Sequence, residues 1–375
     1  MAITERYVRA DAAGGGDGTT DANSGATGAF TWDEMVTDIN TPRVGYRYNV
    51  KQGTYNLSSS STLTGDGTTT SPNIIRGFKD TPGDATLGRG SDGLLNTSNM
   101  PTIVYSSNLQ FHSGGANFLI LESLIFEGST SQPVVAATGA VNYVFNCKIT
   151  NDHAGSGDGL ETSQSGMVIG NDVYLPSGTG VGSEAISAVG PVVGNNVFMG
   201  SAGVGVNMRN NPRECMFNTI IGGTYGIQKN TTSQVLLAYF NTIADCSGSG
   251  IYCNGASTSS ILAFGNHITG CGAYGIDFSG SVCAKILWAN RFRDNSSGNL
   301  STTDDWGGST STFEVTAAGT DSDDFTNVAG LDYSLKTTAA GFQKALFMQL
   351  KNIGANGSSN TGGGGGGASS YTFIG

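Results

Sequence analysis

The chain has 375 residues, of which 58 are glycine, about twice the average share, while charged residues make up only 13 %. Glycine does not recur at every third position and proline is scarce, which excludes a collagen-like chain. The 38 % of apolar residues exclude a solvated disordered chain, and the net charge of −11 disfavours nucleic acid as a partner. A polar, turn-rich, mostly β protein remains.

The first distinct element is a short helix, expected at about residues 31–39. Thr31 stands three residues before Glu34, which is the spacing of a capping box. The helix would present one apolar face, made of Trp32, Met35, Val36 and Ile39. We expect this face to cover the open end of the β-structure that follows.

A repeat of about 24 residues fills the central part of the chain, where phrases such as VGNNVFM, FNTII and FNTIA recur. An asparagine anchors each phrase, and an apolar residue follows it by two positions. The anchors are Asn171, Asn195, Asn218, Asn241, Asn266 and Asn290.

Each repeat contains three short apolar segments separated by Gly, Asn or Ser, which predicts an all-β parallel solenoid with three strands per coil. Each strand would pair with its equivalent one coil away, about 4.8 Å along the axis. The anchoring asparagines would then form a hydrogen-bonded ladder, and we expect them to adopt left-handed backbone angles at a turn. Leucine-rich and helical repeats need patterns that this sequence lacks.

The composition divides the chain into four parts. Residues 1–95 would form the cap and the first coils, and residues 96–300 the regular solenoid. Residues 301–355 would close it, and residues 356–375 form a glycine-rich tail with six consecutive glycines, typical of a flexible linker.

These phrases resemble the right-handed, single-stranded parallel β-helix proteins of the pectate-lyase-like superfamily. The Tyr7-Val8 strand, the glycine-rich loop after it and the V-x-x-G-T-Y phrase ending at Tyr55 are similar to the opening segment of such proteins. The phrase starting at Asn352 resembles their closing segment, and the glycine-rich tail resembles phage-encoded and environmental members. The resemblance implies the β-helix fold and admits polysaccharide lyases, glycoside hydrolases and phage tailspikes.

No catalytic cluster stands out in the repeats. The acidic residues, among them Asp158, Glu161 and Glu184, are scattered along the sequence, and we interpret them as solvated turn residues. A lyase needs a base, commonly Lys or Arg, and Arg209 and Lys229 fall on neighbouring coils. They are the catalytic candidates, with ordinary surface charges as the alternative.

Polar and aromatic residues at equivalent positions of the repeat suggest carbohydrate binding. Gln228, Tyr252 and Asp277 occupy equivalent positions after a Gly–Ile pair, so they are expected to line one outer row. A polar and aromatic row on a rigid face suits sugar binding, and it is equally typical of an ordinary solvent-facing sheet.

No cofactor or metal site is predicted. The chain has 6 Cys without a C-x-x-C pair and only 3 His, which disfavours zinc. If a metal binds, calcium is expected near Asp11, Asp17 and Asp21, although their spacing lacks the EF-hand pattern. Cys246 and Cys271 fall one coil apart, either as stacked thiols or as a disulfide.

Two functions are weighed. The first is a structural or attachment module of a phage-like virion or surface appendage, which displays or binds a cell-surface glycan and self-associates as a trimer or filament. The alternative is a polysaccharide lyase or glycoside hydrolase. The N-terminus shows no classical secretory signal and no apolar run is long enough for a membrane span. We therefore expect a virion or extracellular location reached by another route, with a cytoplasmic protein or a removed signal as alternatives.

Overall fold

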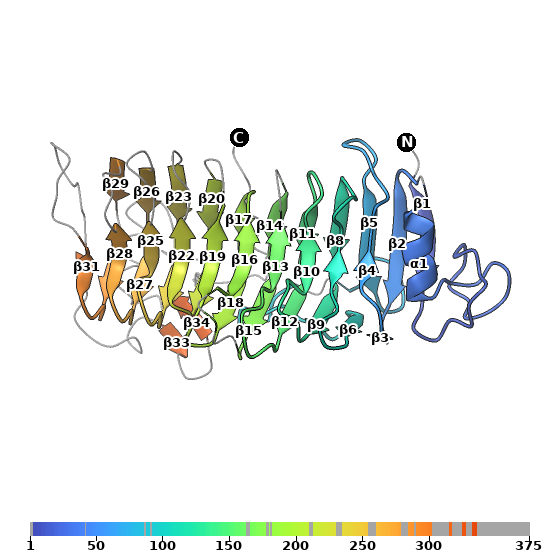
Figure 1. The fold of residues 1–375 in the computed structure, drawn as a ribbon, viewed down its shortest axis with the longest axis horizontal. Helices are drawn as coiled ribbons and strands as arrows, with labels where there is room; N and C mark the ends of the chain where they lie inside the picture. The colour runs from blue at the N-terminus through green and yellow to red at the C-terminus, as the bar shows by residue number, and fades with distance from the viewer. Residues whose placement is uncertain are drawn as a thin grey trace, which may run out of the picture.

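Three parallel β-sheets wind around one long axis in the computed structural model (Figure 1). It describes residues 3–301 together with the strands at 315–316, 325–327 and 332–335. The gaps within the first range are 42, 86–87, 91, 163–165, 178–179, 181, 210–212, 230–234, 254–259, 279–283 and 289.

Each sheet takes one strand from every coil. Sheet A comprises β1 (Thr4–Val8), β2 (Tyr46–Lys51), β5 (Asn73–Phe78), β8 (Leu119–Glu122), β11 (Tyr143–Phe145), β14 (Met167–Ile169), β17 (Val192–Val193), β20 (Arg213–Met216), β23 (Val235–Tyr239), β26 (Ser260–Phe264) and β29 (Ala284–Trp288). Sheet B comprises β3 (Thr54–Leu57), β6 (Thr102–Tyr105), β9 (Ile125–Gly128), β12 (Lys148–Asn151), β15 (Asp172–Leu175), β18 (Asn196–Met199), β21 (Thr219–Ile221), β24 (Thr242–Ala244), β27 (His267–Thr269), β30 (Arg291–Arg293) and β32 (Val315–Thr316). Sheet C comprises β4 (Ser61–Thr62), β7 (Phe111–His112), β10 (Val135–Ala137), β13 (Leu160–Thr162), β16 (Glu184–Ala188), β19 (Val204–Met208), β22 (Tyr225–Lys229), β25 (Ile251–Cys253), β28 (Tyr274–Phe278) and β31 (Gly298–Leu300).

The core consists of aliphatic columns that run along the axis. In sheet B, Val173 pairs with Val197 and Val197 pairs with Ile220, each one coil further on. The whole column is at most 1 % exposed: Ile149, Val173, Val197, Ile220, Ile243, Ile268 and Phe292. Apolar residues at equivalent positions stack on each other because every coil advances by one strand spacing. The predicted parallel solenoid with three strands per coil is thereby confirmed.

The predicted asparagine ladder is present. Each anchor's Nδ2 donates to the Oδ1 of the next anchor, from Asn171 to Asn195 at 3.0 Å and onward to Asn290. The expectation that these asparagines adopt left-handed angles is wrong, because the residue before each of the first five does so instead. Gly170 and Gly194 have φ of 70° and 66°, and Phe217 has φ of 57°. The turn at that preceding residue aims the asparagine side chain along the axis.

The helix α1 (Trp32–Ile39) closes one end, seen at the N-terminal end of Figure 1. The capping box between Thr31 and Glu34 is present. Trp32, Met35 and Ile39 are buried and pack into the same core as the first coils, whereas Val36 is partly buried. The Trp32 Nε1 donates to Ser61 Oγ at 2.7 Å, which ties the helix to sheet C. The predicted capping helix is thereby confirmed.

The bounds of the four predicted parts stay predictions. β2 and β5 continue into β8 within sheet A, so residues 1–95 and 96–300 share their sheets. In 301–355, β32 extends sheet B, and β33 (Phe325–Asn327) pairs antiparallel with β34 (Asp332–Leu335). The closing phrase at Asn352 and the tail 356–375 lie outside the described residues. Within the described part of the chain, we find no helix with the length and apolarity to cross a membrane.

A ladder asparagine in the middle of the stack is expected to be indispensable for stability. The Asn218 Oδ1 accepts from the Asn195 backbone N at 2.9 Å, and its Nδ2 donates to the Val192 carbonyl at 3.0 Å. Asn218→Ala leaves these buried groups without partners, which should cost about 2–4 kcal/mol of unfolding free energy. Urea denaturation measures this loss. The exposed Asn56 serves as the control, and an equal loss in Asn56→Ala would contradict the role of the ladder.

Candidate functional site

The outer face of sheet C carries an unbroken line of polar and aromatic side chains. Its residues pair in register from β13 to β28, one on each consecutive strand. We call them the polar row: Glu161, Ser187, Asn207, Gln228, Tyr252 and Asp277. Sheet C runs across the middle of Figure 1, so the row follows the long axis of the molecule. Five strand spacings of about 4.8 Å give it a length of about 24 Å.

The three residues predicted to bind glycan form one end of this row. Gln228 pairs with Tyr252, and Tyr252 pairs with Asp277. The Tyr225 ring stacks on Tyr252 with centroids 4.1 Å apart and planes 8° apart. The Ser249 Oγ donates to Asp277 Oδ2 at 3.3 Å. The structure therefore brings these three side chains together, and residues of the preceding coils support Tyr252 and Asp277.

A cluster of charges lies at the other end of the row. The Arg209 guanidinium donates to Glu161 at 3.2 Å and to Glu184 at 2.7 Å, so it bridges residues from two successive coils. The Asn207 Nδ2 donates to the second oxygen of Glu184. Arg209 is 39 % exposed and Glu184 only 13 %, so the cluster is open on the arginine side.

Asp158 joins this cluster from the segment before β13. Its Oδ1 accepts a hydrogen bond of 2.8 Å from the Glu184 backbone N. Burial, together with the negative charge of Glu184, raises the pKa of Asp158 to about 7. A carboxyl group that keeps its proton near neutral pH thus lies beside carboxylates that are paired with Arg209.

The interpretation of these three acids as scattered solvated turn residues is wrong. The coil period was the signal that could have grouped them, since Glu161 and Glu184 are 23 residues apart and Arg209 follows 25 later. The coil period could not have grouped Asp158 with them, because Asp158 lies before β13 and joins the cluster through the backbone N of Glu184.

The two catalytic candidates lie on neighbouring coils but are not brought together. Lys229 pairs with Met208 and Cys253 in a column that faces the core, and it is 1 % exposed. Burial lowers the pKa of Lys229. Arg209 follows Met208 by one residue and reaches the outer face. Of the two, Arg209 is thus the side chain that a ligand on the polar row could touch.

Two buried atoms of the polar row have no hydrogen-bond partner within the described part of the chain. They are Ser187 Oγ and Asn207 Oδ1, on residues that are 0 % and 3 % exposed. A buried polar atom without a partner costs about 1–3 kcal/mol, so a bound hydroxyl or a water molecule at these atoms is favoured.

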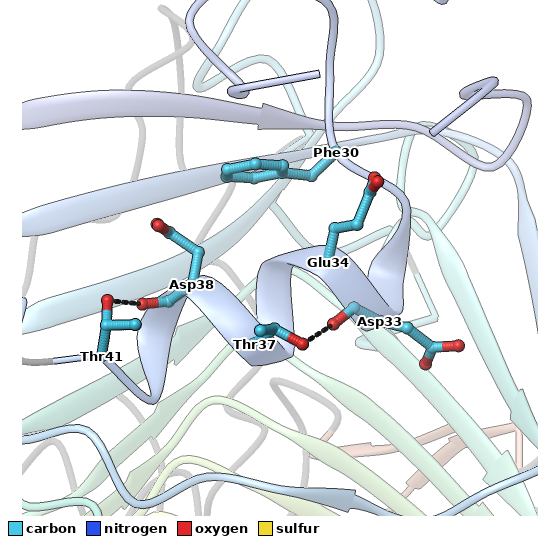
Figure 2. Close-up of a pocket in the computed structure, with 6 residues that line it drawn as sticks. All are labelled: Phe30, Asp33, Glu34, Thr37, Asp38 and Thr41. Atoms are coloured by element: carbon cyan, nitrogen blue, oxygen red, sulfur yellow. Dashed lines mark hydrogen bonds between the residues drawn. The ribbon is translucent and has the colours of Figure 1, made fainter. Parts of the chain in front are cut away.

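An open cleft of about 400 Å³ lies elsewhere, beside α1 (Figure 2). Figure 2 shows the Phe30 ring lying across it, between Glu34 and Asp38. Both carboxylates already hold the cap: Glu34 accepts from the Thr31 backbone N, and Asp38 pairs with Arg43 at 2.8 Å. The cleft is therefore part of the cap, and the polar row is the candidate site.

The residues considered for metal or disulfide chemistry have other partners. Asp11 and Asp21 pair with Arg9, and Asp17 accepts from Thr19. Across the described ranges, no three His, Cys, Asp or Glu side chains gather as a metal site. Cys246 and Cys271 are buried free thiols, and the hydrogen bond between them, with burial, raises the pKa of Cys246 well above its usual range.

Comparison with known proteins identifies the architecture. Residues 122–297 match the family model described as a right handed beta helix region. The chain is a right-handed parallel β-helix. No curated protein sequence matches it significantly. Among solved structures, the β-helix is similar to pectate lyase Pel9A, with a TM-score of 0.58 and 14 % identity over 100 % of this chain and 95 % of that one.

Two further structures are more distant. The PL6 family alginate lyase AlyGC has a TM-score of 0.49 at 11 % identity, covering 72 % of this chain and 39 % of that one. The GH136 lacto-N-biosidase from Eubacterium ramulus has a TM-score of 0.44 at 11 % identity, covering 79 % and 57 %. At 14 % identity, it is the similarity to pectate lyase Pel9A that shows the fold of the β-helix.

Asp158 is expected to make the stability of the β-helix depend on pH. Its folded pKa lies above the unfolded value of 3.8, so the folded state binds more protons and stability falls as pH rises from about 4 to about 7. Asp158→Asn keeps the acceptor for Glu184 and removes the ionisation. From pH 4 to pH 8, the unfolding free energy of Asp158→Asn should rise relative to that of the unmodified protein by up to about 4 kcal/mol.

Chemical denaturation at the two pH values measures this difference. Asp152→Asn, which changes an exposed acid near the same strand, is the control and should show no such gain. An Asp158→Asn effect of the same size at both pH values would contradict the raised pKa.

Proposed function

We propose that this β-helix is an attachment module that binds a glycan along the polar row, as a structural part of a phage-like virion or surface appendage. The observation that carries the proposal is the in-register line of polar side chains, with Tyr252 among them, along sheet C. Its length of about 24 Å is enough for several sugar units in line.

The chemistry of the row suits a neutral or weakly charged saccharide. The partly exposed carboxylates of Glu161 and Asp277 would accept hydrogen bonds from sugar hydroxyls, and Tyr252 offers an apolar ring with a polar tip. Stacked coils hold these groups rigidly, so little side-chain entropy is lost when a ligand binds. One similar structure, with a TM-score of 0.58, is pectate lyase Pel9A, which favours a polysaccharide as the class of ligand.

The placement in a virion or appendage, and thus outside the cell, rests on the low charge and on the resemblance of the glycine-rich tail. The proposed function requires no metal ion. If a metal ion binds, we propose calcium at the N-terminal aspartates.

Tyr252→Ala is expected to weaken glycan binding about 10-fold or more, because the aromatic ring of the polar row is lost. Binding of the full chain to a panel of purified polysaccharides, measured by calorimetry, tests this. Tyr174→Ala is the matched control, since Tyr174 lies on sheet B and stacks on Phe198. No binding to any polysaccharide, or equal weakening in both variants, would overturn the proposal.

Glycoside hydrolysis is the second candidate, favoured by the Asp158 carboxyl beside Glu184 and Glu161. Such hydrolysis needs one protonated and one ionised carboxyl group. Asp158 would give its proton to the glycosidic oxygen, and a carboxylate paired with Arg209 would assist the attack of water on the anomeric carbon.

The expected result is release of reducing ends from one polysaccharide of the panel, reduced about 100-fold or more in Asp158→Asn while binding persists. Absence of reducing ends with binding intact would leave attachment as the function. Absorbance of unsaturated uronate, lost in Arg209→Ala, would replace hydrolysis with lyase chemistry.

A further inference from the structure

The outer face of sheet A carries apolar side chains where a solvent-facing sheet would carry polar ones. Burial alternates strictly, so that Val144 is buried while Tyr143 and Phe145 on either side of it face outward. Two outward columns follow the axis by strand pairing, one from β11 to β26 and the other from β11 to β29, in which Pro191 stands directly before β17. We call them the apolar stripe: Phe145, Ile169, Val193, Met216, Tyr239 and Phe264 in one column, and Tyr143, Met167, Pro191, Glu214, Leu237, Leu262 and Ile286 in the other.

The stripe is almost free of charge. Among its thirteen positions Glu214 is the one side chain of the acidic and basic types that are charged at neutral pH, although the chain as a whole has a net charge of −11. Ile286 is 61 % exposed, and the other positions are half-buried by their neighbours along the columns. Polar side chains, like those on sheet C, would be well hydrated at these positions of sheet A, so contact with water does not explain the apolar side chains. A continuous apolar stripe of this kind marks an interaction surface.

We propose that a second copy of this chain packs on the apolar stripe, so that the protein self-associates side by side. Rows of side chains on the stripe repeat every strand spacing, about 4.8 Å. Another β-helix has ridges of the same period, so two copies interdigitate over their whole length, which a partner of other architecture could not do. The two surfaces also bring few charges together, whereas other faces of two acidic molecules repel.

The size of the stripe is consistent with a reversible dimer. Six strand spacings give a length of about 29 Å, and strands of about five residues give a width of about 16 Å. The projected area is about 500 Å² per copy, so an interface would bury about 1,000 Å² in total, the lower end for a specific contact. The association should therefore depend on concentration. This inference is independent of glycan binding, which uses sheet C.

Sedimentation equilibrium of the full chain tests the proposal over protein concentrations from about 1 to about 200 μM. The unmodified protein should shift from monomer to dimer or a higher oligomer. Leu237→Lys places a charge in the middle of the stripe and should weaken association at least about 100-fold. Tyr252→Lys makes the matched change on the polar row and should associate like the unmodified protein.

Thermal unfolding identifies variants that have lost the fold, and Leu262→Gln provides a milder change on the same column. A monomer at every concentration overturns the proposal. So does unchanged association in both Leu237→Lys and Leu262→Gln, or loss of association in Tyr252→Lys alone, which would move the interface to sheet C. Association of the unmodified protein that both stripe variants weaken and Tyr252→Lys preserves supports it.

Discussion

Fixed stacking of one coil on the next is the constraint on which the rest of this structure depends. The asparagine ladder carries it, because each side chain joins its own coil to the coils before and after. These groups are buried, so a shift of register would leave donors and acceptors without partners at every step. Once the register is fixed, residues about 24 apart in the sequence become neighbours, and each strand position becomes a column.

Columns let the three sheets carry different chemistry. Inward columns must be apolar because they form the core, whereas outward columns are free to vary. On sheet C the outward column is polar and aromatic, and on sheet A the outward columns are apolar. A glycan along one face and a second copy along the other would therefore not compete, which is the arrangement that an attachment protein with several identical binding surfaces needs.

The charged end of the polar row is organised at a cost in stability. Burial keeps Asp158 protonated near neutral pH, and Ser187 and Asn207 hold polar atoms without partners inside the described structure. Arg209 offsets part of this cost by pairing with Glu161 and Glu184. Such local costs are typical of surfaces kept for a ligand, whereas in the cap beside α1 the carboxylates of Glu34 and Asp38 have partners.

The sequence by itself determined the period, the ladder and the capping helix, because each depends on spacing along the chain. Only the tertiary structure decided on which side of sheet C Lys229 and Arg209 lie. In β22 two successive residues face the core: a Cβ at Gly226 would touch Ile243, and Ile227 is fully buried. Lys229 aligns with Met208 and not with Arg209, and since one residue of register reverses the face, Lys229 lies inside and Arg209 outside.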